Sequence, residues 1–317
     1  MNKRYLYYLI VLALLTVMLI SLSPYADVTI SKNQMSAVAE QLPVLKDGAE
    51  EINLSALSFL SVFVNPNGET KILAEKNVND RLPIASLTKL MTAIVASENY
   101  HPEEIMAISN KALNSKGRSL KFEPGEIFKV NDLLHSLLIE SNNDAAEVLA
   151  IRAGQEKFVG AMNIEAAALG LKDTFFINPT GLDPDGAEEF VNYSTAEDLF
   201  KIARVFVEKY PSLLNITLKK EYDLYTADSE FHHKVESTDE LLSADWQSEN
   251  GETIKILGGK TGETPFSKQN LILIVGAPGG SGYLINVILG SSSRFDEMKK
   301  LTEWAFDAYV WQTVKPK

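Results

Sequence analysis

Pro83-Ile84-Ala85-Ser86-Leu87-Thr88-Lys89-Leu90-Met91-Thr92 is the stretch of this 317-residue chain that says most about its fold. It holds the chain's single S-x-x-K motif, from Ser86 to Lys89. Pro83 precedes apolar side chains at helical spacing, so we expect a helix from about Ser86 to Ser97. Residues three apart share one face of a helix. The pattern therefore predicts that the Lys89 amine lies next to the Ser86 hydroxyl.

Two further short motifs follow in order. Lys260-Thr261-Gly262 is the chain's single K-T-G sequence. Ser141-Asn142-Asn143 is an S-x-N sequence, a pattern that also occurs at Ser31, Ser97 and Ser248. The middle motif is thus identified by its position between the other two, directly after a helical pattern, and carries little weight alone.

The three motifs together indicate acyl transfer through a serine ester. A serine hydroxyl is a poor nucleophile until a base takes its proton. Lys89 can be that base if burial and the charge of Lys260 lower its pKa. Ser141 would bridge the two lysines and relay the proton to the leaving amine, while Asn143 would hold Lys89 and the substrate amide. An isolated S-x-x-K is more often a helix cap with a solvated lysine, an interpretation that the other two motifs disfavour.

The K-T-G motif is interpreted as an edge strand that lines the cleft. An extended substrate can pair with such an edge through its backbone, and Gly262 permits close approach. Lys260 and Thr261 offer donors for a terminal carboxylate. The backbone N–H groups of Ser86 and Glu263 are the expected oxyanion hole.

Composition excludes several other kinds of protein. A net charge of -12 and a pI near 4.9 argue against nucleic acid as a partner. The chain has no cysteine, which removes thiol nucleophiles, disulfides and cysteine–zinc sites. None of its four histidines has H-E-x-x-H spacing, and the adjacent His232 and His233 are more typical of a solvated loop than of a metal site. We expect neither a cofactor nor a metal.

The N-terminus predicts membrane attachment. Lys3 and Arg4 precede an uncharged, largely apolar run over 5–22, long enough to cross a bilayer. We favour an uncleaved anchor over a cleaved signal, with the rest of the chain on the extracytoplasmic face. The expected organisation is an anchor or signal at 1–26, a tether at 27–55 and a catalytic domain at 56–317.

Hydrophobic periodicity predicts an α/β (α+β) fold. A hairpin is expected over 57–74, mainly helices over 130–208, strands again over 253–289 and a closing amphipathic helix over 295–311. Strands at both chain ends imply one antiparallel sheet with a helical subdomain inserted between them. The active site would lie in the cleft where the two meet.

Over residues 57–311 the chain resembles the penicillin-binding serine D-alanyl-D-alanine carboxypeptidases of the low-molecular-mass type. The resemblance rests on the three motifs with their flanks and on the segments 178–183 and 194–198. It implies a β-lactamase/transpeptidase-like fold, removal of the terminal D-alanine from peptidoglycan stem peptides ending in D-Ala-D-Ala, and covalent capture by β-lactams. It also implies that Arg294, just before the last helix, helps to hold the substrate carboxylate.

The sequence departs from this family pattern in three places. Asn142 replaces the usual glycine, and the usual Asn-Thr-Asn segment is reduced to Glu236-Ser237-Thr238-Asp239. The second domain and C-terminal anchor of many relatives are not expected, so the N-terminal segment would provide the anchoring. A D,D-endopeptidase, a transpeptidase, a β-lactamase and a non-turnover penicillin or cell-wall sensor remain alternatives. The lack of an E-x-x-L-N segment disfavours the β-lactamase.

Overall fold

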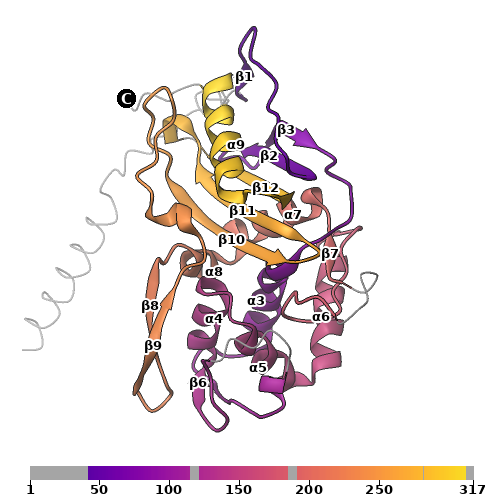
Figure 1. Ribbon diagram of the computed structural model, residues 1–317, viewed down its shortest axis with the longest axis vertical. Coiled ribbons are helices and arrows are strands. Elements are labelled where there is room, and N and C mark those ends of the chain that lie inside the picture. The colour runs from indigo at the N-terminus through magenta and orange to yellow at the C-terminus, as the bar shows by residue number, and fades with distance from the viewer. Residues whose placement is uncertain (1–41, 115–120, 185–190, 281, 312–317) are drawn as a thin grey trace, which may run out of the picture. The chain divides into compact units, whose positions relative to one another are not determined.

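The computed structural model describes residues 42–114, 121–184, 191–280 and 282–311 (Figure 1). The predicted anchor at 1–26 lies outside these described residues, as does the tether from 27 to 41. Within the described ranges, no helix combines the length and the apolar character needed to span a bilayer. The compact unit described below begins at Leu42.

A five-stranded antiparallel sheet forms the centre of the unit (Figure 1). Its strands, in spatial order, are β10 (Ile256–Thr264), β11 (Lys268–Gly276), β12 (Tyr283–Ser291), β2 (Ser58–Val64) and β3 (Thr70–Lys76). Strands from both ends of the chain therefore share one sheet, which confirms the predicted topology. β10 is an edge strand, as the K-T-G motif predicted.

Both faces of the sheet are apolar, because neighbouring apolar side chains of one strand point to opposite faces. Successive side chains of a strand point to opposite faces. Leu271 and Leu273 of β11 belong to the core that α9 (Arg294–Ala308) covers, whereas Ile272 and Ile274 belong to the core on the other side. That second core includes Leu199, Ile202 and Phe206 of α7 (Ala196–Lys209), behind the sheet in Figure 1.

The helical subdomain stands next to the edge of the sheet and surrounds one central helix. That helix, α3 (Thr88–Asn99), is buried at every position from Thr88 to Ala96 and follows a short 3-10 turn, η2 (Ala85–Leu87). The helices that pack around it are α4 (Val130–Ile139), α5 (Asn143–Ala153) and α6 (Gln155–Ala168), and α8 (Pro211–Thr217) lies against α4 and β10. The predicted helices over 86–97 and 130–208 are confirmed with small shifts of their ends.

Short strands add antiparallel pairs that hydrophobic periodicity did not predict. The pairs are β8 (Glu221–Tyr225) with β9 (Phe231–Glu236), β5 (Ile105–Ala107) with β6 (Ile127–Lys129), and β4 (Leu82–Pro83) with β7 (Tyr193–Ser194). The further 3-10 turns are η3 (Ala112–Asn114), η4 (Glu240–Ser243) and η5 (Pro278–Gly280). His232 and His233 lie in strand β9, so their interpretation as a solvated loop is wrong.

The domain begins earlier than residue 56, the predicted boundary. β1 (Val44–Leu45) pairs with β13 (Tyr309–Val310) directly after α9. The Trp304 indole donates to the Glu50 carbonyl at 2.7 Å, and Leu54 is buried in the core against α9. Residues 42–55 are therefore part of the folded unit, because their few apolar side chains pack on the closing helix.

Candidate active site

The predicted nucleophile, Ser86, lies just before the start of the buried helix α3. Ser86 is the middle residue of η2, and the next helix, α3, carries Lys89. The Lys89 Nζ atom donates to Ser86 Oγ at 2.7 Å. Ala85, just before the serine, has φ of 48°, a left-handed conformation that residues with a Cβ rarely adopt. Such strain persists only where the surroundings fix the backbone, and it is common at active sites.

Lys89 is completely buried and donates to three acceptors. Besides Ser86 Oγ, its Nζ atom lies 2.7 Å from Asn143 Oδ1 and 2.7 Å from the Thr180 carbonyl oxygen. Burial and then the nearby charge of Lys260 lower the pKa of Lys89 well below its usual value, against a smaller opposing effect of Glu147. The lowered pKa favours the neutral amine, which is the form that a general base requires.

Lys260 connects the second motif with the third. Its Nζ atom donates to Ser141 Oγ at 2.9 Å and to the Thr261 carbonyl oxygen at 3.0 Å. Burial, followed by the charge of Arg294, lowers the pKa of Lys260 to about 7, while Asp239 acts in the opposite direction. Lys260 therefore changes its charge within the physiological pH range.

Strand β10 passes very close to the serine. A Cβ atom on Gly262 would lie 2.9 Å from the Ile84 carbonyl oxygen and 3.2 Å from the Ser86 nitrogen. Only glycine fits this approach without a shift of the backbone. The K-T-G motif thus brings the sheet edge against the turn that carries the nucleophile, and Glu263 follows on the same strand.

Arg294 joins this edge from the first residue of α9. Its Nη1 atom donates to Glu263 Oε2 at 2.7 Å, and its side chain is only 13% exposed. Its Nε atom is buried and has no hydrogen-bond partner among the described residues. All nine residues predicted for the site therefore lie around the serine turn and the neighbouring end of β10: Ser86, Lys89, Ser141, Asn143, Lys260, Thr261, Gly262, Glu263 and Arg294.

Sequence reasoning did not identify two functional contacts at this edge. The first is the Thr180 carbonyl, the third acceptor of Lys89. The second is Thr238, whose Oγ1 lies 2.5 Å from Thr261 Oγ1 and whose backbone N–H donates to the Ile139 carbonyl at 3.2 Å. The turn chemistry of 178–181 indicates a loop, but nothing in it indicates that a carbonyl oxygen faces a lysine.

The described residues contain no group of three or more histidine, aspartate or glutamate side chains placed to hold a metal ion. The groups gathered at the serine turn and the end of β10 are serine hydroxyls, two buried lysine amines, an amide group and backbone donors. This set can supply a nucleophile, a base and a proton relay for acyl transfer.

Comparison with known proteins finds relatives that are named D-alanyl-D-alanine carboxypeptidases. The chain is 33% identical over 264 residues to D-alanyl-D-alanine carboxypeptidase DacC of Escherichia coli K12, and 33% identical over 253 residues to DacF of Bacillus subtilis 168. These matches cover 78% and 75% of this chain and 60% of each relative, so the chain spans about three fifths of their length.

A solved structure shows the same fold. Penicillin-binding protein D2 of Listeria monocytogenes, in an ampicillin-bound form, superposes with a TM-score of 0.67 at 30% identity. The match covers 81% of this chain and the whole of that one. The family model described as D-alanyl-D-alanine carboxypeptidase (Peptidase_S11) matches residues 48–293, a range that holds both lysines, both serines and the K-T-G edge. The resemblance inferred from the motifs is thereby confirmed, and the chain belongs to the D-alanyl-D-alanine carboxypeptidase family of serine peptidases.

Proposed function

We propose that this protein is a serine D,D-carboxypeptidase that removes the terminal D-alanine from peptidoglycan stem peptides. One observation carries the proposal: a buried lysine amine with a lowered pKa lies 2.7 Å from the hydroxyl of Ser86. That arrangement activates a serine without a histidine.

The reaction follows from the hydrogen bonds of the site. Neutral Lys89 takes the Ser86 proton while Oγ attacks the carbonyl carbon of the penultimate D-alanine. The backbone N–H groups of Ser86 and Glu263 would hold the oxyanion, each such donor being worth about 3–4 kcal/mol in the transition state. When the C–N bond breaks, Ser141 passes a proton to the leaving amine. Water then hydrolyses the ester and releases the shortened peptide.

Substrate recognition is assigned to the edge of β10 and the cations beside it. An extended stem peptide can pair with the strand, as peptides do with other exposed sheet edges. Lys260, Thr261 and Arg294 offer donors to the terminal carboxylate. β-Lactams, which carry a carboxylate beside a reactive amide, would be captured as a Ser86 ester.

The cellular location belongs to the same proposal. Peptidoglycan lies outside the cytoplasmic membrane, and Lys3 and Arg4 precede the apolar run over 5–22. The N-terminal segment would therefore hold the catalytic domain on the extracytoplasmic face of the membrane.

The deciding experiment measures turnover by the full chain in detergent. A pentapeptide ending in D-Ala-D-Ala should release free D-alanine over many cycles, and prior incubation with penicillin should abolish the release. Penicillin labelling without D-alanine release would instead indicate a sensor, whereas transfer of the peptide to an added amine would indicate a transpeptidase. Rapid penicillin hydrolysis would indicate a β-lactamase.

The pKa of Lys260 predicts how the reaction depends on pH. The protonated amine attracts the substrate carboxylate, so kcat/KM for D-alanine release should fall as the pH rises through about 7. The fall should approach about tenfold per pH unit where the charge is required. Lys260→Arg is the matched control, because arginine stays protonated and should move the falling limb to higher pH. An unchanged limb in that variant would contradict the role of the Lys260 charge.

A further inference from the structure

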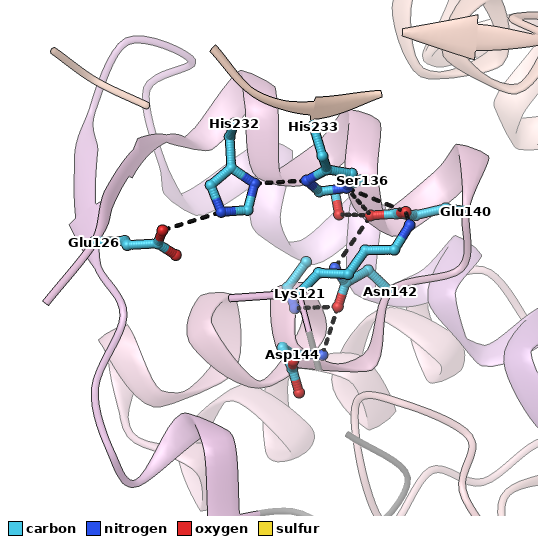
Figure 2. A network of polar contacts seen from close by, with 9 residues as sticks. Lys121, Glu126, Ser136, Glu140, Asn142, Asp144, His232 and His233 are labelled. Atoms are coloured by element: carbon cyan, nitrogen blue, oxygen red, sulfur yellow. Dashed lines mark hydrogen bonds and ion pairs between the residues drawn. The ribbon is translucent and has the colours of Figure 1, made fainter. Parts of the chain in front are cut away.

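A polar network that the reaction does not use lies beside the second motif (Figure 2). Its centre is Glu140, the residue that directly follows α4, whose side chain is 8% exposed. The carboxylate accepts hydrogen bonds from four side chains: Ser136 Oγ at 2.7 Å, Lys121 Nζ at 2.5 Å, Asn142 Nδ2 at 3.2 Å and His233 Nε2 at 3.2 Å. These donors come from α4, β9 and two loops, so Glu140 joins segments that are far apart in the sequence.

Glu140 is ionised throughout the pH range of enzyme assays. Burial by itself raises the pKa of a carboxyl group, but the hydrogen bonds from His233, Lys121 and Ser136 outweigh it and lower the pKa of Glu140 to about 2. A carboxylate can only accept hydrogen bonds, and each of its partners is a donor. The four contacts are therefore mutually compatible only while Glu140 stays charged.

The two histidines of β9 extend this network to a second carboxylate. His233 Nε2 faces Glu140, and His232 Nε2 faces Glu126 at 3.0 Å (Figure 2). Both Nε2 atoms donate in these contacts, because carboxylates accept. The two Nδ1 atoms lie 2.5 Å apart, so the histidine pair joins Glu126 to Glu140.

The side chain of Asn142 connects Glu140 to the catalytic groups through hydrogen bonds. Its Nδ2 atom donates to Glu140, and its Oδ1 atom accepts from the backbone N–H groups of Asp144 at 2.8 Å and Ala145 at 3.2 Å. The amide thereby caps α5, the helix whose first residue is Asn143. Between the two tied residues, Ser141 has φ of 61°, a left-handed conformation that its Cβ disfavours.

We propose that Glu140 is a positioning residue for acyl transfer. Through Asn142 it holds the left-handed turn that places Ser141 Oγ against Lys260 and the start of α5 that places Asn143 Oδ1 against Lys89. This role requires the side-chain amide of Asn142, since glycine at this position would have no amide to join Glu140 to the helix. The inference rests on the proposed function only in that Ser86 must form an ester.

Glu140→Gln tests the proposal in the full-length protein. The glutamine amide keeps the size of the side chain but brings N–H donors toward four other donors, so the turn should loosen. Acylation of Ser86 by a fluorescent penicillin, followed by stopped flow, should slow by about ten- to a hundredfold, as misplacements of about 1 Å do. Non-covalent penicillin affinity should stay the same. The pH midpoint of acylation should not move, because Glu140 is not among the groups that shift the pKa of Lys89 or Lys260.

Glu126→Gln is the matched control. It removes the other carboxylate that holds the histidine pair, but Glu126 contacts no residue of the second motif. Acylation should then stay within about twofold of wild type, the spread expected for an independent site. Equal slowing by both variants would show that the network supports the hairpin rather than the motif, and would overturn the proposal.

Asn142→Ser supplies the second, independent variant. Serine caps a helix well but its shorter side chain gives up the contact with Glu140. This variant alone should slow acylation at an unchanged melting temperature, and adding Glu140→Gln to it should cost no more than about a further twofold. The inference would be refuted if Asn142→Ser acylated at the wild-type rate. It would also be refuted if the rate reductions of Asn142→Ser and Glu140→Gln multiplied in the double variant. Because acylation is read without D-alanine release, a failure of the proposed carboxypeptidase activity remains distinguishable.

Discussion

Replacing Lys89 by methionine is expected to slow acylation of Ser86 by about 10²- to 10⁴-fold, the usual contribution of a general base. Methionine has a similar length and no branch, so it fills the space of the lysine stem without supplying an amine. Ser86 would keep its place in η2 but would lose the group at 2.7 Å that accepts its proton. Its hydroxyl would then be no more nucleophilic than that of any buried serine.

The stability of the same variant should change much less than its activity. Removal of the amine takes away the donor that Asn143 Oδ1 and the Thr180 carbonyl share, and a buried acceptor that loses its hydrogen bond costs about 1–3 kcal/mol. Against this, the variant no longer has to bury an ammonium group, which is costly in a site with no exposure. A melting temperature within several degrees of wild type is therefore expected.

Lys89→Arg separates the base from the charge at this position. Arginine offers donors and a permanent positive charge, but it does not release a proton near neutral pH. If Lys89 acts as a base, the arginine and methionine variants should both fail to form the penicillin ester, which intact-protein mass measures directly. Ser86→Ala lacks the nucleophile and gives the background signal of the assay. Near-wild-type acylation by either Lys89 variant would contradict the lysine-base mechanism.

The parts of the site that could be predicted are those that local sequence spacing determines. The Ser86–Lys89 contact follows from three-residue spacing at the start of a helix. The place of Lys260 at a sheet edge follows from the interpretation of the K-T-G motif as an edge strand. The strands predicted over 253–289 likewise follow from apolar runs that alternate with glycine-rich turns.

The parts that could not be predicted depend on long-range packing. The two strands of the β8–β9 hairpin are too polar for a clear strand signal. Their sequences are Glu221-Tyr222-Asp223-Leu224-Tyr225 and Phe231-His232-His233-Lys234-Val235-Glu236. It is held by contacts with segments about 100 residues away, such as Tyr222 Oη to Asp132 at 2.7 Å. The role of Thr180 is equally hidden, because its backbone carbonyl is the functional group and any residue type has one.

Gly181 gives the second large expected effect, because its backbone touches the turn that carries the nucleophile. Its φ is 84°, and a Cβ atom there would lie 1.9 Å from the Ala85 carbonyl oxygen and 3.0 Å from the Ser86 nitrogen. Both neighbours are backbone atoms, so no side chain can move aside. Gly181→Ala must displace either η2 or the loop over 178–183. The second movement would withdraw the Thr180 carbonyl from Lys89.

Gly181→Ala should therefore slow penicillin acylation by about 10²-fold, the cost of a misplacement of about 1 Å. It should also lose about 1–3 kcal/mol of stability through overpacking, in addition to about 1–2 kcal/mol for the left-handed backbone. Gly170→Ala isolates the second contribution, since Gly170 has φ of 71° and nothing within 4 Å of a Cβ atom. In thermal melting, that control should lose only the stability that the left-handed backbone costs. It should acylate at the wild-type rate. If the two alanine variants behave alike, strain alone explains the effect, and the close approach of residue 181 to the serine turn does not govern the reaction.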